Sequence, residues 1–267
     1  PILVIGVQIE RCREHRWLKI HQHGYVLKLL TQEKMLDSRP SSTPINKGMT
    51  KQTSYDDGLP DTSADKKART RFLVIFGMLL WLAEKTRKDL RFTVNFYGRM
   101  VSYAKQHHLD LIRGQPLRYL NGTRDFGLVY QAGKELKLSG AADADFAGDC
   151  VKQRSTIGTL GKLGDFGLIW DGCSLVKCIQ TSTGHSETTA AASWCKEQVS
   201  ARVQLREFGL AEQGRVHCLV DNAGVVKQAV NTTNHAQAKH YRVAQAYIRE
   251  KCDSEEVLME KCDTDDN

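Results

Sequence analysis

The sequence lacks the long apolar run that a membrane-spanning protein needs. Its longest such run is Phe72 to Ala83, well short of the roughly 20 residues of a membrane-spanning helix. It also lacks the basic segment followed by an apolar one that marks a secretory signal. We therefore expect no association with a membrane and no secretion, and we interpret the apolar run as a buried helix. The chain opens with Pro1 in place of Met, which suggests a segment of something longer.

Cysteine patterns that bind metals are absent too. None of the eight cysteines forms a C-x-x-C pair, and the cysteines and histidines together show no spacing typical of a zinc site. We expect reduced thiols in an intracellular protein, and histidines that belong to the surface or the core. Internal repeats and low-complexity tracts are also lacking, so 267 residues should fold as one large domain or two ordinary ones.

Positive charge is concentrated in one half of the chain. Residues 1–130 hold 22 Lys and Arg against 12 Asp and Glu, a net charge of +10, whereas residues 131–267 hold 16 against 19, a net charge of −3. A basic half joined to a mildly acidic half suits a surface that grips a polyanion next to a carboxylate-rich catalytic site. Ordinary solvated charge would give the same balance, and charge alone does not separate the two interpretations.

The first half is predicted to combine strands with amphipathic helices. Residues 1–10 are apolar and β-branched, which is typical of a strand, and residues 18–30 pass from an extended into a helical pattern. Residues 37–65 carry the clustered Pro, Gly, Ser and Asp of a loop. Helical spacing of apolar positions covers residues 66–99, with an interruption near Thr86, and residues 109–120.

The second half is predicted to be an α/β domain with a mixed sheet flanked by helices. Alternating apolar residues indicate three strands, and a stretch free of Pro and Gly with an apolar stripe indicates a long helix after them. A short buried strand and further helices complete the pattern, which favours a mixed central sheet. The strands are expected at residues 136–147, 156–163, 166–170 and 216–220, and the helices at residues 186–208, 221–230 and 238–251.

Three acidic residues of the second half occupy positions from which active sites are built. Asp143 lies in the first expected strand, Glu187 near the start of the long helix, and Asp221 at the C-terminal end of the strand VHCLV. Each acid alone is best interpreted as a solvated or capping side chain. Three of them on consecutive core elements would repel one another unless cations neutralise them. We therefore predict a divalent-metal site, in which hard oxygen ligands favour Mg²⁺ over zinc or copper.

Several blocks of sequence, taken in order, resemble one known family. RYLNGTRDFGLVY (residues 118–130) resembles the RYLKGTRDYGLxY segment of copia-type retrotransposon Pol polyproteins, and DADFAGD and RST follow it at the family's spacing. KEQVSARVQLREFGL, VDNAG and AKHYRVAQAYIRE are similar to later blocks of the family. IGVQIER, HQHGYVLKLL, SSTP and TRKDL resemble the end of its reverse transcriptase. Any single block is weak, but together they cover nearly the whole chain in the family's order.

The resemblance implies two domains and an activity. Residues 1–130 would be the C-terminal part of a reverse transcriptase, a largely helical thumb and connection region without the polymerase active site. Residues 131–267 would be a ribonuclease H-like domain, truncated at its C-terminus. Asp143, Glu187 and Asp221 would be its catalytic residues and metal ligands. The family's enzyme hydrolyses the RNA strand of RNA–DNA hybrids with two divalent ions, Mg²⁺ or alternatively Mn²⁺.

The resemblance also implies partners. The hybrid would be gripped through phosphates and ribose hydroxyls, because degradation must ignore base sequence. The residues expected to make these contacts are Arg118, Arg124, Arg154, Lys239 and His240. The rest of the Pol polyprotein would be a second partner, and neither a membrane nor a small-molecule substrate is expected. The protein would work in a cytoplasmic virus-like particle or in the nucleus.

Some positions depart from the family's pattern. Its fourth carboxylate would lie beyond the end of the chain, and the nearby Asp263, Asp265 and Asp266 are out of register for metal chemistry. The Tyr-Asp-Asp run at residues 55–57 has the wrong spacing for a polymerase motif. A catalytically inactive nucleic-acid-binding remnant is therefore the alternative to an active ribonuclease H. A host protein built on the domain for protein–protein contacts is a third reading, which has no positive support in the sequence.

Overall fold

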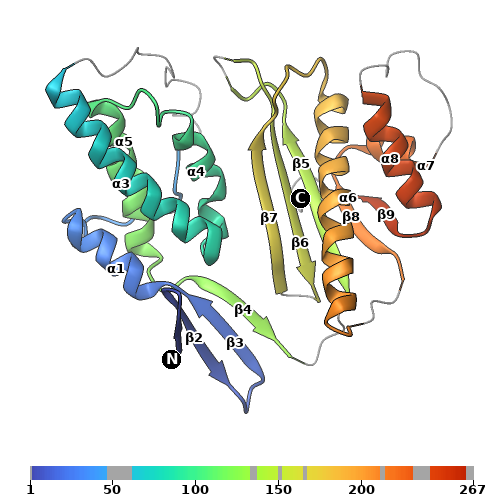
Figure 1. Cartoon of the computed structure of the whole chain (residues 1–267), viewed down its shortest axis with the longest axis horizontal. Coiled ribbons are helices and arrows are strands. Elements are labelled where there is room, and N and C mark those ends of the chain that lie inside the picture. Colours follow the sequence, from blue (N-terminus) through green and yellow to red (C-terminus); the bar gives the residue numbers. More distant parts are fainter. Residues whose placement is uncertain are drawn as a thin grey trace. The chain divides into compact units, whose positions relative to one another are not determined.

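The chain folds into two compact units, Pro1–Ala132 and Gly133–Asn267 (Figure 1). In this computed structural model the described residues are 2–46 and 62–132 of the first unit, and 137–149, 152–164, 167–210, 214–230 and 241–262 of the second. No helix within these ranges is long and apolar enough to cross a membrane.

The first unit contains a four-stranded antiparallel sheet in the order β1-β2-β3-β4. Its first two strands form a hairpin, so the single strand predicted over residues 1–10 is wrong. Ile5 and Gly6 turn the chain there, with φ values of 49° and 75°. This left-handed conformation suits a two-residue hairpin and is one that glycine adopts at no steric cost. The strands are β1 (Ile2–Val4), β2 (Val7–Cys12), β3 (Trp17–His21) and β4 (Gly127–Gln131).

Helices build the core of the first unit. The long helix, its interruption near Thr86 and the later helix are confirmed. Thr62 caps the long helix by accepting a hydrogen bond from the backbone N–H of Asp65 at 3.0 Å. The helices are α1 (His23–Gln32), α3 (Ser63–Lys85), the 3-10 helix η1 (Lys88–Leu90), α4 (Arg91–Gly98) and α5 (Gln106–Gly122). Large side chains fill the core between them, among them Leu29, Phe72, Leu79, Phe96 and Leu120.

A buried arginine ties these helices together. Arg87, only 1% exposed, donates hydrogen bonds to Asp89 Oδ2 at 2.6 Å and to Thr123 Oγ1 at 2.7 Å. Its guanidinium also faces the rings of Tyr119 and Phe126. A charge buried this deeply is tolerated only when it is paired and hydrogen-bonded. Arg87 therefore fixes the segment after α3 against the end of α5.

The second unit is built on a mixed five-stranded sheet in the order β7-β6-β5-β8-β9. β5, β6 and β7 pair antiparallel, whereas β8 is parallel to β5 and β9 is parallel to β8. The predicted α/β class and mixed sheet are confirmed, and β9 is a strand that the sequence pattern did not predict. The strands are β5 (Leu138–Asp145), β6 (Thr156–Leu163), β7 (Gly167–Leu175), β8 (Val216–Val220) and β9 (Val257–Lys261).

Three helices pack on this sheet: α6 (Thr183–Glu207), α7 (Ala223–Val230) and α8 (Arg242–Asp253). They share one core with the sheet face that carries Ala142 and Val216. Most core side chains here are small, since Ala, Val and Cys predominate, and Trp194 is the largest side chain among them.

A glycine brings α6 close to the sheet. Trp194 on α6 donates its indole N–H to the carbonyl of Leu160 on β6 at 2.7 Å. A Cβ at Gly140 on β5 would collide with that indole nitrogen. Close docking of the helix on β5 therefore requires Gly140. The site described below depends on this docking.

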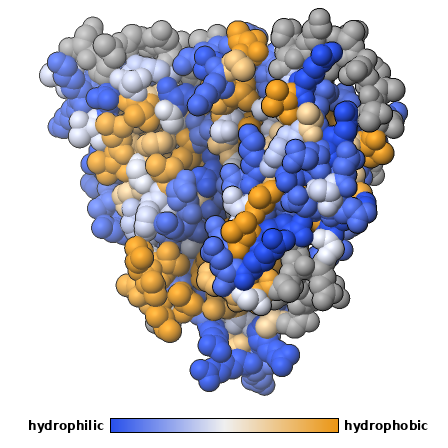
Figure 2. Space-filling model, turned by 45° about the vertical axis from the view of Figure 1, so that its right-hand side comes forward, coloured by the Kyte–Doolittle hydropathy of each residue, from blue (hydrophilic) through white to orange (hydrophobic). Residues whose placement is uncertain are grey.

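Hydrophobic side chains reach the surface in places, as the orange groups in Figure 2 show. Among the described residues, the run Ile2 to Ile5 is the most apolar exposed stretch, with side chains that are 46% to 79% exposed. It includes β1, the edge strand of its sheet. Exposed apolar edge strands are places at which sheets can pair with a further strand.

Candidate metal centre

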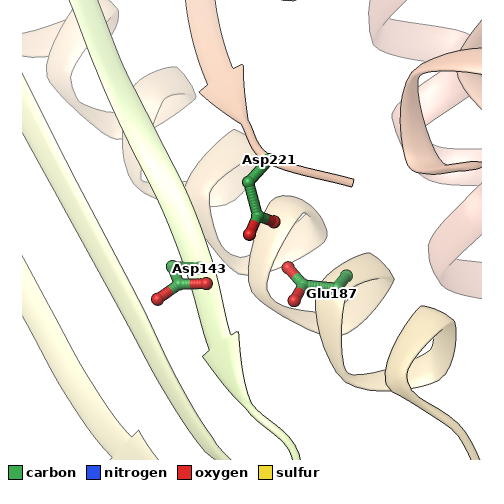
Figure 3. Close-up of side chains that lie close together, drawn as sticks. All are labelled: Asp143, Glu187 and Asp221. Carbon is green, nitrogen blue, oxygen red and sulfur yellow. The ribbon is translucent and has the colours of Figure 1, made fainter. Parts of the chain in front are cut away.

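Three carboxylates from separate elements of the second unit come together (Figure 3). Asp143 lies on β5, Glu187 on α6, and Asp221 directly after β8. Each offers one oxygen, and these three oxygens lie within 4.8 Å of one another. The structure thus brings together the acids that the sequence singled out. Their roles as catalytic residues and metal ligands stay predictions.

Strand pairing places Asp143. Along β5 the side chain of Ala142 is buried in the core, whereas Asp143, the next residue, is exposed. Alternation of this kind is the ordinary period of a strand. Gly158 of β6 lies directly opposite Asp143. Because glycine has no side chain, β6 leaves the space beside the Asp143 carboxylate open at this position.

Glu187 is positioned by the start of α6. Ser182 caps the helix, because its hydroxyl oxygen accepts a hydrogen bond from the backbone N–H of His185 at 3.2 Å. The hydroxyls of Ser186 and Thr188, on either side of Glu187, donate to backbone carbonyls of the same helix. These neighbours satisfy their hydrogen bonds within α6 and leave Glu187 to face the other two acids.

The backbone on both sides of Asp221 is held. The carbonyl of Val220 accepts a hydrogen bond from the N–H of Cys262, beyond β9, at 3.0 Å. The side-chain oxygen of Asn222 accepts one from the N–H of Gly224 at 2.8 Å, an Asx turn that begins α7. Asp221 therefore sits at the C-terminal end of a central strand, the edge at which α/β sheets commonly place functional side chains.

Glu187 carries the strongest electrostatic strain of the site. The residue is 8% exposed, and its Oε2 atom has no hydrogen-bond partner within the described part of the chain. Burial first, and then the nearby charges of Asp221 and Asp143, raise the pKa of Glu187 to about 8. A buried carboxylate that faces two like charges is costly unless a cation compensates it.

The donor set fits a hard divalent cation. Carboxylate oxygens are the ligands that Mg²⁺ and Mn²⁺ prefer, whereas zinc and copper sites use thiolates and imidazoles more often. A cation bound here would offset the repulsion that raises the pKa of Glu187, and it would also give the Oε2 atom a partner. Asp143 is exposed, so the same ion would remain within reach of water and substrate.

Of the five predicted nucleic-acid-binding residues, three lie in the described part of the chain. Arg118 donates to the carbonyl of Arg39 at 2.7 Å, and Arg124 donates to the carbonyl of Leu36 at 2.9 Å. Both arginines thus hold a loop of the first unit. Arg154 lies in the connection between β5 and β6, where its carbonyl accepts a hydrogen bond from the backbone N–H of Asp149. Contact with nucleic acid stays a prediction for all three. Lys239 and His240 lie outside the described residues, as do residues 55–57 and Asp263, Asp265 and Asp266.

A ring pair close to the carboxylates was not predicted. His185, two positions before Glu187, stacks on Tyr241, with ring centroids 4.9 Å apart and ring planes 19° apart. The pair connects the first turn of α6 to the residue that precedes α8. Contacts between residues so far apart in sequence leave no local pattern, so no signal in the sequence could have found Tyr241.

Several known proteins are similar to this chain. No family model matches the chain. The chain is 29% identical over 267 residues to the retrovirus-related Pol polyprotein from transposon TNT 1-94 of Nicotiana tabacum, an alignment that takes in 99% of this chain. It is also 29% identical over 248 residues, or 92% of this chain, to the Pol polyprotein from transposon RE2 of Arabidopsis thaliana. Over nearly its whole length, the chain is thus similar to the Pol polyproteins of copia-type retrotransposons.

The chain spans 20% and 16% of the length of those two relatives. A solved structure of RNase H1 from the archaeon Halobacterium salinarum NRC-1 is similar to it with a TM-score of 0.36 and 13% identity, over 49% of this chain and 88% of that one. The second unit has three antiparallel strands, a long helix and a parallel fourth strand, in that order. This is the order of elements that the resemblance implies for a ribonuclease H-like domain.

Proposed function

We propose that the second unit of this Pol chain hydrolyses the RNA strand of RNA–DNA hybrids with the help of divalent metal ions. The observation that carries the proposal is the convergence of Asp143, Glu187 and Asp221 within 4.8 Å, with no cation from the described residues to neutralise them. Such a site is unfavourable by itself. It becomes useful when the reaction needs bound cations next to a phosphodiester.

The three carboxylates would share the work of holding two ions, Mg²⁺ or Mn²⁺. Divalent ions at such a site activate the attacking water and stabilise the leaving oxygen. Asp143 and Asp221 come from neighbouring strands of one sheet, so their separation is fixed by strand pairing. Glu187 comes from a helix that is tightly docked on that sheet through Trp194. This rigid support is what metal chemistry requires of its ligands.

An RNA–DNA hybrid is the favoured substrate because the chain is similar to Pol polyproteins of retrotransposons, which are copied through RNA. Residues 1–130 would correspond to the thumb and connection region of the reverse transcriptase, and the rest of the polyprotein would be a partner. Recognition would run through the sugar-phosphate backbone, with Arg154, in the connection between β5 and β6, as one contact. The protein would act inside the cell, in a cytoplasmic virus-like particle or in the nucleus.

Cleavage of a labelled RNA–DNA hybrid tests the proposal. We expect cleavage in millimolar Mg²⁺ or Mn²⁺, none in EDTA, and a loss of about 100-fold or more in Asp143→Asn and Asp221→Asn. Asp253→Asn is the matched control, because Asp253 is exposed at the end of α8 and lies outside the cluster. Equal cleavage by wild type and both cluster variants would contradict the assignment of the site.

The alternative is a remnant that binds nucleic acid without cutting it. It is favoured by one observation, namely that the cluster within the described residues holds three acids and no fourth. The same assay separates the two functions, because a remnant would retain hybrid in a mobility-shift gel and leave the RNA strand intact in both metals.

A further inference from the structure

A basic concavity lies at one end of the sheet of the first unit. It has a volume of about 490 Å³ and is formed by β2, β3, the turn between them and the end of β4. Arg11, Arg13 and Arg16 line it together with the aromatic residues Trp17 and Tyr130. Cys12, Leu18, Gln131 and Ala132 complete the lining. We call this site the arginine concavity.

The three arginines differ from most others of the first unit. Elsewhere the guanidinium groups are held by carboxylates, side-chain amides or backbone carbonyls: Arg69, Arg71, Arg87, Arg91, Arg99, Arg113, Arg118 and Arg124. Arg11, Arg13 and Arg16 are exposed, and their side chains have no partner among the described residues. Arg39 shares this condition but does not line the concavity. Three cations gathered around one hollow are therefore available to a ligand.

The turn that carries them is held in an unfavourable conformation. Arg16 has a φ of 53°, in the left-handed region that glycine adopts readily and other residues seldom do. The end of β4 holds it there: the backbone N–H of Ala132 donates to the carbonyl of Arg16, and the Gln131 side chain donates to the carbonyl of His15, both at 2.8 Å. A long cationic side chain thus occupies a position where glycine would be less strained.

We propose that the arginine concavity binds the phosphodiester backbone of a nucleic-acid strand. The planar guanidinium group matches a pair of phosphate oxygens, and three such groups around one concavity suit an anion with several phosphates better than one with a single phosphate. Trp17 and Tyr130 supply aromatic surface of the kind on which bases and sugars pack. The net charge of +10 over residues 1–130 would draw a polyanion to this unit. Glu14 lies in the same turn but does not line the concavity.

This inference deepens the proposed function and rests on it for the identity of the strand, as part of an RNA–DNA hybrid. It gives the first unit a defined nucleic-acid-binding site, which is separate from the carboxylates proposed to hold the catalytic metal ions. Because the contacts are to phosphates, binding should be indifferent to base sequence and should weaken steeply with salt.

The test is binding of a labelled RNA–DNA hybrid to the full chain in EDTA, so that the carboxylate site is not engaged through metal. The triple variant Arg11→Gln, Arg13→Gln, Arg16→Gln should bind about tenfold more weakly or worse at moderate salt. Its log–log salt dependence should be shallower by about 2 to 3 units, since each lost phosphate contact removes about 0.9. The matched triple Lys28→Gln, Lys66→Gln, Lys67→Gln removes equal charge from exposed positions outside the concavity and should bind nearly as wild type does.

A single variant guards against a folding artefact. Arg16→Gly relieves the left-handed strain, so the thermal midpoint should stay the same or rise while hybrid binding falls. A structural role for Arg16 would lower both. Competition identifies the ligand: an unlabelled hybrid should displace the label, whereas inorganic phosphate, pyrophosphate and anionic lipid vesicles at the same phosphate concentration should not.

Three results would overturn the proposal: wild-type affinity in the arginine triple, an equal loss in the lysine triple, or equal displacement by small phosphates or vesicles. None of these depends on catalysis. Cleavage in Mg²⁺ is measured separately. A protein without nuclease activity and a protein whose arginine concavity does not bind nucleic acid would therefore give different results.

Discussion

Two buried glutamates, one in each unit, show opposite ways of handling a buried negative charge. Glu33, at the end of α1, is 4% exposed and is paired with Arg71 at 2.8 Å and Arg113 at 2.9 Å. Glu187 is 8% exposed and faces two further carboxylates. The first charge is neutralised by its own unit, and the second is neutralised by none of the described residues. Burial of an acidic side chain therefore does not by itself indicate a functional role. Burial next to other negative charges does indicate one.

The same contrast runs through the two units. The first packs large apolar side chains around charges that are paired internally, as at Arg87. The second packs small side chains so that a helix and two strands can bring three acids together. A functional site assembled in this way lowers the stability of the folded protein. Departures from the usual rules of packing and charge pairing are therefore expected at functional sites. Substitutions of the buried charges should therefore change stability in opposite directions in the two units.

The largest effect is expected at Arg87. Arg87→Ala removes a fully buried cation and the hydrogen bonds that it donates to Asp89 and Thr123. We expect a loss of about 3 to 5 kcal/mol in the free energy of unfolding of the first unit, measured by urea denaturation. Arg39→Ala is the matched control, because its side chain is exposed and without a partner within the described ranges. Equal stability of the two variants would show that the network around Arg87 contributes nothing.

A smaller loss is expected at Glu33. Glu33→Gln keeps the shape of the side chain but removes the charge that holds Arg71 and Arg113, which are 50% and 38% exposed. Solvent screens those arginines in part, so we expect a loss of about 2 kcal/mol in the free energy of unfolding. Glu14→Gln, in an exposed turn, should leave the midpoint of urea denaturation unchanged. A Glu33→Gln variant that is more stable than wild type would contradict the proposed difference between Glu33 and Glu187.

The smallest effect has the opposite sign. In metal-free buffer at a pH above 8, Glu187→Gln should stabilise the second unit on the order of 1 kcal/mol, because it removes the central charge of a repelling group. The folded-state pKa of Glu187 is raised to about 8, above its ordinary value of 4.5. Wild type therefore keeps its stability below about pH 4.5 and loses part of it as pH rises through 8. The advantage of the variant should accordingly fade on acidification.

Thermal unfolding of both proteins over this pH range, with EDTA present, measures that advantage. Asp253→Asn replaces an exposed acid outside the cluster and should show no comparable rise at high pH. A Glu187→Gln variant that is less stable than wild type at every pH would mean that the carboxylate makes a favourable contact in the folded protein.

Much of the second unit followed from sequence because its signals are local. Alternating residues gave β5 and β6, and an unbroken apolar stripe gave α6. The three acids were found because each stands at the end or the edge of such an element. β9 was missed because VLMEK is short and lies next to polar residues. It pairs in parallel with β8, which lies far away in the sequence. The periodicity of apolar residues within a strand does not show which strand it pairs with.

The first unit shows the limit of local signals more clearly. Residues 127–131 form β4 only by pairing with β3, more than a hundred positions earlier in the chain. The arginine concavity depends on that same pairing, since Tyr130 and Gln131 close one side of it. Residues 11–16 show a basic turn in the sequence, but the hollow that gathers their side chains exists only in three dimensions. The packing of Trp194 against Gly140 could not be predicted either. A glycine in a strand leaves space for another side chain, but the sequence does not show which side chain fills that space.

Direct binding of Mn²⁺ to the full chain, measured by isothermal titration calorimetry near neutral pH, tests the central claim that the three carboxylates of the second unit form a divalent-metal site. The account predicts saturable binding by wild type and by Asp253→Asn, and binding at least about tenfold weaker in Asp143→Asn and Asp221→Asn, because each removes a charged oxygen ligand. Equal binding by all four proteins, or no binding by wild type, would contradict it.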